Sequence, residues 1–125
     1  MPSHLWPWLW RALLLVLLLV GWQIALAPVT SHAPDWFENA DKVRHAGAFF
    51  VFWCVGAPGF ARSRWLWLAG GLLGYGAAIE IAQGLLTTDR DASFADWIAD
   101  ALGLALGHQV ANHMNTAGSL SGKCR

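Results

Sequence analysis

Long apolar stretches fill most of this chain, and they restrict its fold more than any other feature. Of its 125 residues, 56% are hydrophobic and only 13% are charged, whereas a soluble domain carries about 25% charged residues. Four stretches, at about 10–27, 41–60, 65–86 and 92–114, approach the roughly 20 residues that a helix needs to cross a bilayer. Backbone polar groups in lipid must be satisfied within the segment, so each stretch should be helical. The pattern predicts an all-α transmembrane bundle of four helices.

These stretches leave no room for a separate soluble domain. We expect residues 1–114 to form one membrane domain and residues 115–125 to form a polar, flexible tail. The first stretch has an alternative interpretation as a signal peptide, because Ala25-Leu26-Ala27 resembles a cleavage site. Pro28 directly after that site should hinder cleavage, and it more simply ends a retained helix. A retained first helix is therefore favoured.

A carboxylate stands inside one of the apolar stretches. Glu80 lies within residues 65–86, and charged groups inside a membrane cost roughly 2.5–3.5 kcal/mol on insertion scales, so they usually face a partner or a wet cavity. Successive helices alternate in direction, so the start of 41–60, the end of 65–86 and the start of 92–114 fall on one side. The polar residues there form the candidate ligand-binding set: Asp41, Lys42, His45, Glu80, Gln83, Arg90, Ser93, Asp96 and Asp100.

Helix spacing predicts that this set points into the bundle. Glu80 and Gln83 are three residues apart and share a helix face. Along the last stretch, polar residues continue into Gly103 and Gly107, and such small-residue faces let helices approach closely. The same glycine-rich faces offer a surface for forming an oligomer.

Several of these residues also have purely structural explanations. Asp41 could be the N-cap of its helix. Ser93 and Asp96 fit a capping box, S-x-x-D. Glu80 could form a structural ion pair, for which Arg90 is the favoured partner. A capping role leaves Glu80 unexplained, because it lies far from any helix start.

Basic residues in short loops favour a topology with both termini inside. In that orientation the polar set lies in the outer leaflet. The inner side then carries five basic residues (Arg11, Arg62, Arg64, Lys123 and Arg125), and the outer side carries three (Lys42, Arg44 and Arg90).

Composition excludes some classes of partner. The net charge is zero and no basic block is present, so we expect no nucleic-acid partner. Neither Cys54 nor Cys124 has a second Cys or a His at metal-ligand spacing. A single His45 with scattered carboxylates is weak evidence for a metal. We therefore expect no cofactor and no metal.

Four short motifs occur in order between Asp41 and Gly107. They are Asp41-Lys42-x-x-His45, Glu80-x-x-Gln83, Arg90-x-x-Ser93-x-x-Asp96 and Gly103-x-x-x-Gly107. This ordered set resembles the VanZ-like family of small bacterial membrane proteins. The chain departs from the family at Asp100, where Asn is usual, and this adds a negative charge one turn from Asp96. The resemblance implies a multi-helix protein of the bacterial cytoplasmic membrane, in a family whose namesake is associated with low-level resistance to the glycopeptide teicoplanin.

Three functions fit these residues, and the family supplies no established reaction. The favoured one is a cell-envelope protein that binds a polar or anionic head group, of a lipid or a glycopeptide-like molecule, among membrane lipids. The alternative is an intramembrane enzyme acting on an envelope lipid, with His45, Glu80 and Asp96 as candidate acid and base residues and Asp41 orienting His45. A transporter is less favoured, because the polar groups occupy one leaflet only.

Overall fold

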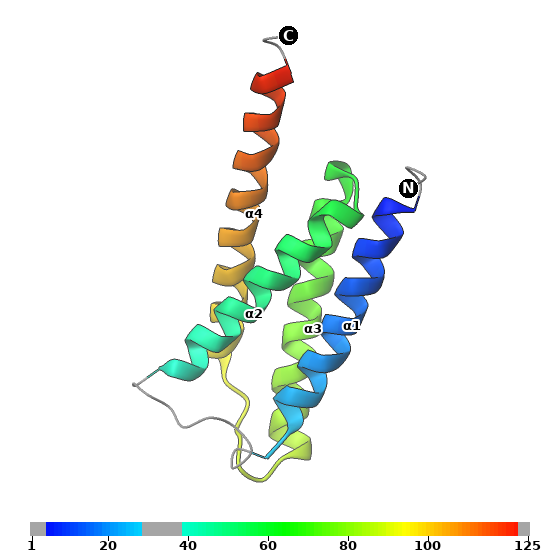
Figure 1. Ribbon diagram of the computed structural model, residues 1–125. Coiled ribbons are helices and arrows are strands. Elements are labelled where there is room, and N and C mark those ends of the chain that lie inside the picture. Colours follow the sequence, from blue (N-terminus) through cyan, green and yellow to red (C-terminus); the bar gives the residue numbers. More distant parts are fainter. Residues whose placement is uncertain (1–4, 29–38, 123–125) are drawn as a thin grey trace.

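The protein is all-helical over the residues that its computed structural model describes, 5–28 and 39–122. No strand occurs in these residues. Four α-helices follow one another in this described part of the chain (Figure 1), with two short 3₁₀ turns between the second and third. The elements are α1 (Trp6–Leu26), α2 (Ala40–Gly56), η2 (Ala57–Gly59), η3 (Arg62–Arg64), α3 (Trp65–Leu86) and α4 (Phe94–Gly122).

The helix bounds agree with the expected ones in part. α3 spans the predicted residues 65–86. α1 begins earlier than expected, with Pro7 in its first turn, where a missing backbone N–H removes no helical hydrogen bond. α2 ends at Gly56 rather than at residue 60. Pro58 follows within η2, and its ring disfavours a continued α-helix.

The expectation of a helix end at Met114 is wrong. α4 continues to Gly122, so most of the predicted tail is helical, while residues 123–125 lie outside the described part. Nothing after Pro58 in the sequence is a proline, so no ring interrupts the helical hydrogen bonds. The Thr116 hydroxyl donates to the carbonyls of Asn112 and His113 at 3.1 and 2.9 Å.

Within the described residues, two helical segments are long and apolar enough to cross a membrane. They are α1 and the segment Arg62–Leu86, which includes η3 and α3. α2 has only 17 residues, and α4 begins with Asp96 and Asp100 among its first turns.

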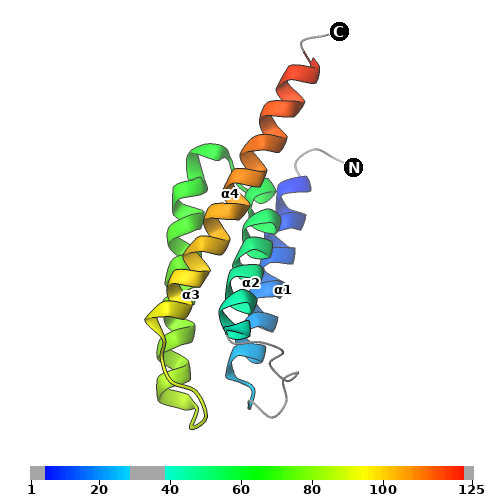
Figure 2. The same cartoon turned by 90° about the vertical axis from the view of Figure 1, so that its left-hand side faces the viewer.

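The helices alternate in direction, so their ends meet at two poles. In Figures 1 and 2, the end of α1, the start of α2, the end of α3 and the start of α4 lie at the lower pole. We call this the polar pole, because all the candidate ligand-binding residues lie on these helix ends or on the loop between α3 and α4.

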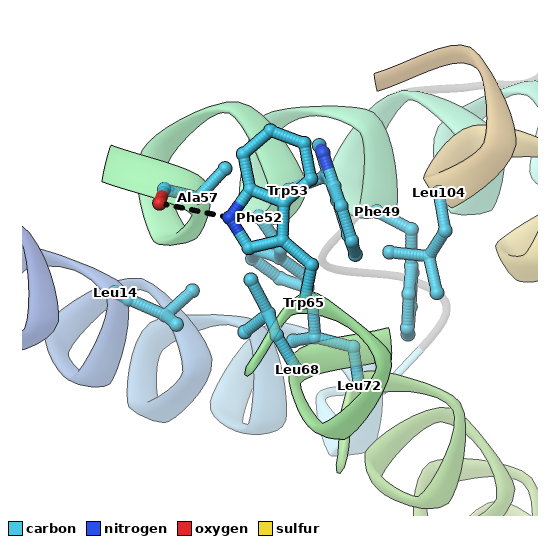
Figure 3. Close-up of a cluster of buried hydrophobic side chains, with 9 residues drawn as sticks. All are labelled: Leu14, Phe49, Phe52, Trp53, Ala57, Trp65, Leu68, Leu72 and Leu104. Carbon is cyan, nitrogen blue, oxygen red and sulfur yellow. Dashed lines mark hydrogen bonds between the residues drawn. The ribbon is translucent and has the colours of Figure 1, made fainter. Parts of the chain in front are cut away.

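An aromatic and aliphatic cluster joins all four helices away from the polar pole (Figure 3). Trp53 and Trp65 pack edge to face, with ring centroids 5.6 Å apart. The Trp65 indole N–H donates to the Ala57 carbonyl at 3.3 Å. This bond accounts for the buried indole N–H, which would otherwise be costly. The cluster comprises Leu14, Phe49, Phe52, Trp53, Ala57, Trp65, Leu68, Leu72 and Leu104.

Glycines bring α4 against α2. A Cβ on Gly103 would collide with the backbone carbonyl of Ala46, and one on Gly107 would lie 2.8 Å from Trp53 Cβ. The predicted packing role of this pair is therefore seen within one chain. By contrast, Gly70 and Gly74 of α3 have open space beside them. Of these two glycine pairs, only Gly70 and Gly74 leave room for a second copy of the chain.

Candidate functional site

Three ionisable side chains from three helices meet at the polar pole. His45 comes from α2, Glu80 from α3 and Asp100 from α4. His45 Nδ1 lies 2.8 Å from Asp100 Oδ1, where the carboxylate accepts the hydrogen bond, and 3.8 Å from Glu80 Oε1. The His45 side chain is 12% exposed, and those of Glu80 and Asp100 are 8% and 1% exposed. We call these three residues the His-Glu-Asp cluster.

A glycine makes room for Asp100 beside α3. A Cβ on Gly76 would lie 2.6 Å from Asp100 Oδ2 and 3.0 Å from the Phe49 ring. Any larger residue at position 76 would therefore displace the carboxylate or the ring. Gly76 lies one turn before Glu80, so the same face of α3 admits Asp100 and supplies Glu80.

Glu80 completes a cap at the start of α4. The Ser93 hydroxyl accepts the backbone N–H of Asp96 at 3.3 Å, as the predicted capping box requires. In such a box the N–H of Ser93 would be bound by the side chain of Asp96. Here it donates instead to Glu80 Oε2 at 2.7 Å. The Glu80 carboxylate of α3 thus accepts the hydrogen bond that the Asp96 carboxylate would accept in a complete capping box. The Asp96 carboxylate is left to make other contacts.

Asp96 and Asp41 make further charge contacts. Lys42 Nζ lies 3.5 Å from Asp96 Oδ1. Asp41 Oδ2 lies 3.9 Å from His45 Nε2, and Asp41 Oδ1 lies 4.0 Å from the Arg44 guanidinium. Asp41 lies in the first turn of α2, and Asn39 occupies the N-cap position without a side-chain cap bond. The capping role considered for Asp41 is therefore wrong, because the helix begins one residue before it.

A cavity of about 160 Å³ opens beside the His-Glu-Asp cluster, between α1, α2 and α3. Gln83 closes one side, where its side-chain amide donates to the Ala25 carbonyl at 3.0 Å. This bond satisfies one of the carbonyls left open at the end of α1. Near the polar pole the lining includes charged and polar groups beside the apolar Ile24 and Ala25 of α1, and toward the middle of the bundle it is apolar or aromatic. The polar ones are Asp41, Arg44, His45, Gln83 and Arg90, and the others include Ala48, Phe49, Phe52, Tyr75 and Ile79.

Some buried carboxylate oxygens lack hydrogen-bond donors. Glu80 Oε1, Asp96 Oδ1 and Asp100 Oδ2 are covered and accept no hydrogen bond. A buried charged group without donors costs several kcal/mol, unless a proton or a cation neutralises it. The Lys42 ammonium lies 3.5 Å from Asp96 Oδ1 and offsets part of its charge, so the shortage of donors falls on Glu80 Oε1 and Asp100 Oδ2.

The structure brings most of the predicted set together. Arg90 was the expected ion-pair partner of Glu80. Arg90 lines the cavity with His45 and Arg44. The contacts described for Glu80 are with Ser93 and His45. The expected orienting residue for His45 was Asp41, but the hydrogen-bonded carboxylate is Asp100.

Two aromatic residues beside the site were missed. Tyr75 donates its hydroxyl to the Leu18 carbonyl at 2.6 Å and lines the cavity. Trp97 donates its indole N–H to the Leu73 carbonyl at 3.0 Å. The signal available for Tyr75 was that it is the only tyrosine and lies in an apolar stretch, where a hydroxyl needs a partner.

No protein-family model, curated protein or solved structure matches this chain.

Proposed function

We propose that this chain is a four-helix protein of the bacterial cytoplasmic membrane that binds the polar head group of an envelope lipid at its polar pole. The outer surface of the helices supports a lipid environment. Large apolar side chains stay exposed on it, among them Leu66, Trp67, Leu85 and Phe94 at 83, 82, 78 and 73%. Large apolar side chains exposed on all four helices fit contact with a membrane or a partner.

The lining of the cavity is the observation that carries the proposal. Two guanidinium groups, from Arg44 and Arg90, lie at its polar end with one carboxylate, from Asp41. Two positive groups and one negative group at this end favour the binding of an anionic group such as a phosphate. Phe49 and Tyr75 line the deeper part, which suits the apolar portion of the same ligand. A ligand with a charged head and an apolar chain matches both ends.

The size of the cavity favours a lipid over a whole glycopeptide. At about 160 Å³ it is smaller than the roughly 300–1,000 Å³ of pockets that enclose drug-sized ligands. A head group with the start of one chain fits this space, and the rest of a lipid chain would lie along the exposed helices. The resemblance to the VanZ-like family supports an envelope role, and through it a link to glycopeptide resistance.

Lipid binding can be measured by native mass spectrometry of the full-length protein in detergent. We expect phosphatidylglycerol to be retained over phosphatidylcholine, and retention to fall at least about tenfold in Arg44→Ala and Arg90→Ala, because each removes a charge-assisted hydrogen-bond donor. Arg62→Ala is the matched control, since Arg62 is exposed and bonds to Asn112 away from the cavity. Equal retention of both lipids, or equal loss in all three variants, would contradict the proposal.

A second candidate is an acid–base enzyme acting on such a lipid. The hydrogen bond between His45 Nδ1 and Asp100 favours it, because a buried carboxylate on one ring nitrogen orients the other as a general base. His45 also lines the cavity. Incubating the protein with lipid extract and analysing products by mass spectrometry tests this function. A product that is lost in His45→Ala, and kept in His108→Ala, would favour the enzyme over a binding protein.

A further inference from the structure

The His-Glu-Asp cluster has the donor atoms of a metal site. His45, Glu80 and Asp100 each offer one ligand atom, and these atoms lie within 4.8 Å of one another. The ligands come from three different helices and are separated by 20 to 55 residues. Nothing in their spacing along the chain indicates a metal motif, so only the packing of the helices brings them together.

Two unpartnered oxygens provide an independent observation. Glu80 is 6% exposed and Asp100 is 0% exposed, yet Glu80 Oε1 and Asp100 Oδ2 accept no hydrogen bond. Glu80 Oε1 points toward the His45 ring nitrogen at 3.8 Å, too far for a hydrogen bond. Two carboxylates thus surround one imidazole, which supplies at most one positive charge.

We propose that the His-Glu-Asp cluster binds a divalent transition metal ion, with Zn²⁺ as the best-matched species. One imidazole nitrogen and two carboxylate oxygens are ligands that Zn²⁺ accepts at about 2.0–2.2 Å. Two such ligands on a tetrahedral ion lie about 3.4 Å apart. The distances from His45 Nδ1 to Asp100 Oδ1 and to Glu80 Oε1, 2.8 and 3.8 Å, lie on either side of that value. The ion would take the place of the proton between His45 and Asp100.

The neighbouring trio of Asp41, His45 and Asp96 is the weaker choice. Its ligand atoms are also close together, but Lys42 already lies 3.5 Å from Asp96, and Asp41 is 42% exposed. A bound ion in the His-Glu-Asp cluster would cross-link α2, α3 and α4 at the polar pole. Three protein ligands also leave a coordination position for water or another ligand. Binding of the ion does not depend on the lipid function proposed above.

The test uses the full-length protein in detergent, with any polyhistidine tag removed, after treatment with a chelator and dialysis. Zn²⁺ is then titrated and followed by elemental analysis after desalting and by the melting temperature. We expect one Zn²⁺ per chain and a melting temperature that rises with Zn²⁺ concentration. His45→Ala, Glu80→Gln and Asp100→Asn should each weaken binding by about 100-fold or more, because two ligands remain where three are needed.

Two measurements keep the outcome interpretable. His108→Ala removes a histidine that bonds to Asn112 outside the cluster, so it should bind Zn²⁺ like the wild type. Circular dichroism shows whether each variant retains its helices, and Glu80→Gln keeps the side-chain volume. Zn²⁺ binding that is absent in the wild type, or that is equally strong in the folded Glu80→Gln and Asp100→Asn variants, would overturn the proposal. Lipid retention without added metal is a separate readout, so failure of this site and failure of the lipid function are distinguishable.

Discussion

Asp100 Oδ1 lies 2.8 Å from His45 Nδ1, and this contact joins α4 to α2 across 55 residues of sequence. Asp100 is the most buried polar residue of the site. An Asn amide at this place could still bond to the imidazole, but it would carry no charge. Both the acid–base and the metal proposals therefore depend on this carboxylate.

Enlarging Gly76 should destabilise the protein. In Gly76→Ala the new Cβ would lie 2.6 Å from Asp100 Oδ2 and 3.0 Å from Phe49, so we expect a loss of about 1–3 kcal/mol from overpacking. Gly74→Ala is the control on the same helix, because open space surrounds that position. It should be neutral or stabilising by up to about 1 kcal/mol, since Ala favours helix more than Gly does. Thermal unfolding in detergent measures both, and equal melting temperatures would contradict the prediction.

Enlarging Gly103 should separate α4 from α2. A Cβ there collides with the Ala46 backbone carbonyl, which cannot rotate away as a side chain can. We expect Gly103→Ala to cost about 1–3 kcal/mol or more, and also to weaken whatever binds at His45, which lies next to Ala46. Gly70→Ala, in open space on α3, should leave binding unchanged and be neutral or stabilising by up to about 1 kcal/mol. The same unfolding assay, paired with the lipid or Zn²⁺ assay, checks this.

Ser93 should stabilise the start of α4. Ser93→Ala removes the hydroxyl that caps Asp96, and we expect a loss of about 0.5–2 kcal/mol. In this variant the Ser93 backbone N–H would keep its hydrogen bond to Glu80. Glu80→Gln should weaken that second hydrogen bond instead, because an uncharged amide oxygen is a weaker acceptor than a carboxylate. Ser63→Ala, at an exposed position where no side-chain cap bond forms, should change stability by less than about 0.5 kcal/mol. Comparable losses in the two serine variants would count against the cap.

The polar pole should face the outside of the cell. Thr88, in the loop after α3, and Ser63, in η3, are exposed, and these two segments lie at opposite poles (Figure 1). In a chain whose two cysteines are replaced by serine, we expect Thr88→Cys to react with a membrane-impermeant maleimide in intact cells. Ser63→Cys should react only after permeabilisation. The reverse pattern would invert the topology, and labelling of both in intact cells would show that these poles do not lie on opposite sides of a membrane.

Much of the helical framework could be predicted from the apolar stretches. They predicted α3 to its observed bounds, because a continuous apolar run ends where polar loop residues begin. They failed at Met114, because polarity predicted a tail where helical hydrogen bonding continues without proline. Alternating helix direction also placed the polar residues at one pole, since antiparallel helices bring those ends together.

Which residues touch was decided only by the tertiary structure. Spacing gives the height and the face of a residue on its own helix, but not how neighbouring helices are rotated against each other. That rotation depends on close contacts such as Gly103 with Ala46 and Gly76 with Asp100. Because of this rotation, His45 forms its hydrogen bond with Asp100 rather than with Asp41, and the Ser93 N–H donates to Glu80. The sequence by itself thus determined the helices and the polar pole, and packing between helices determined the site.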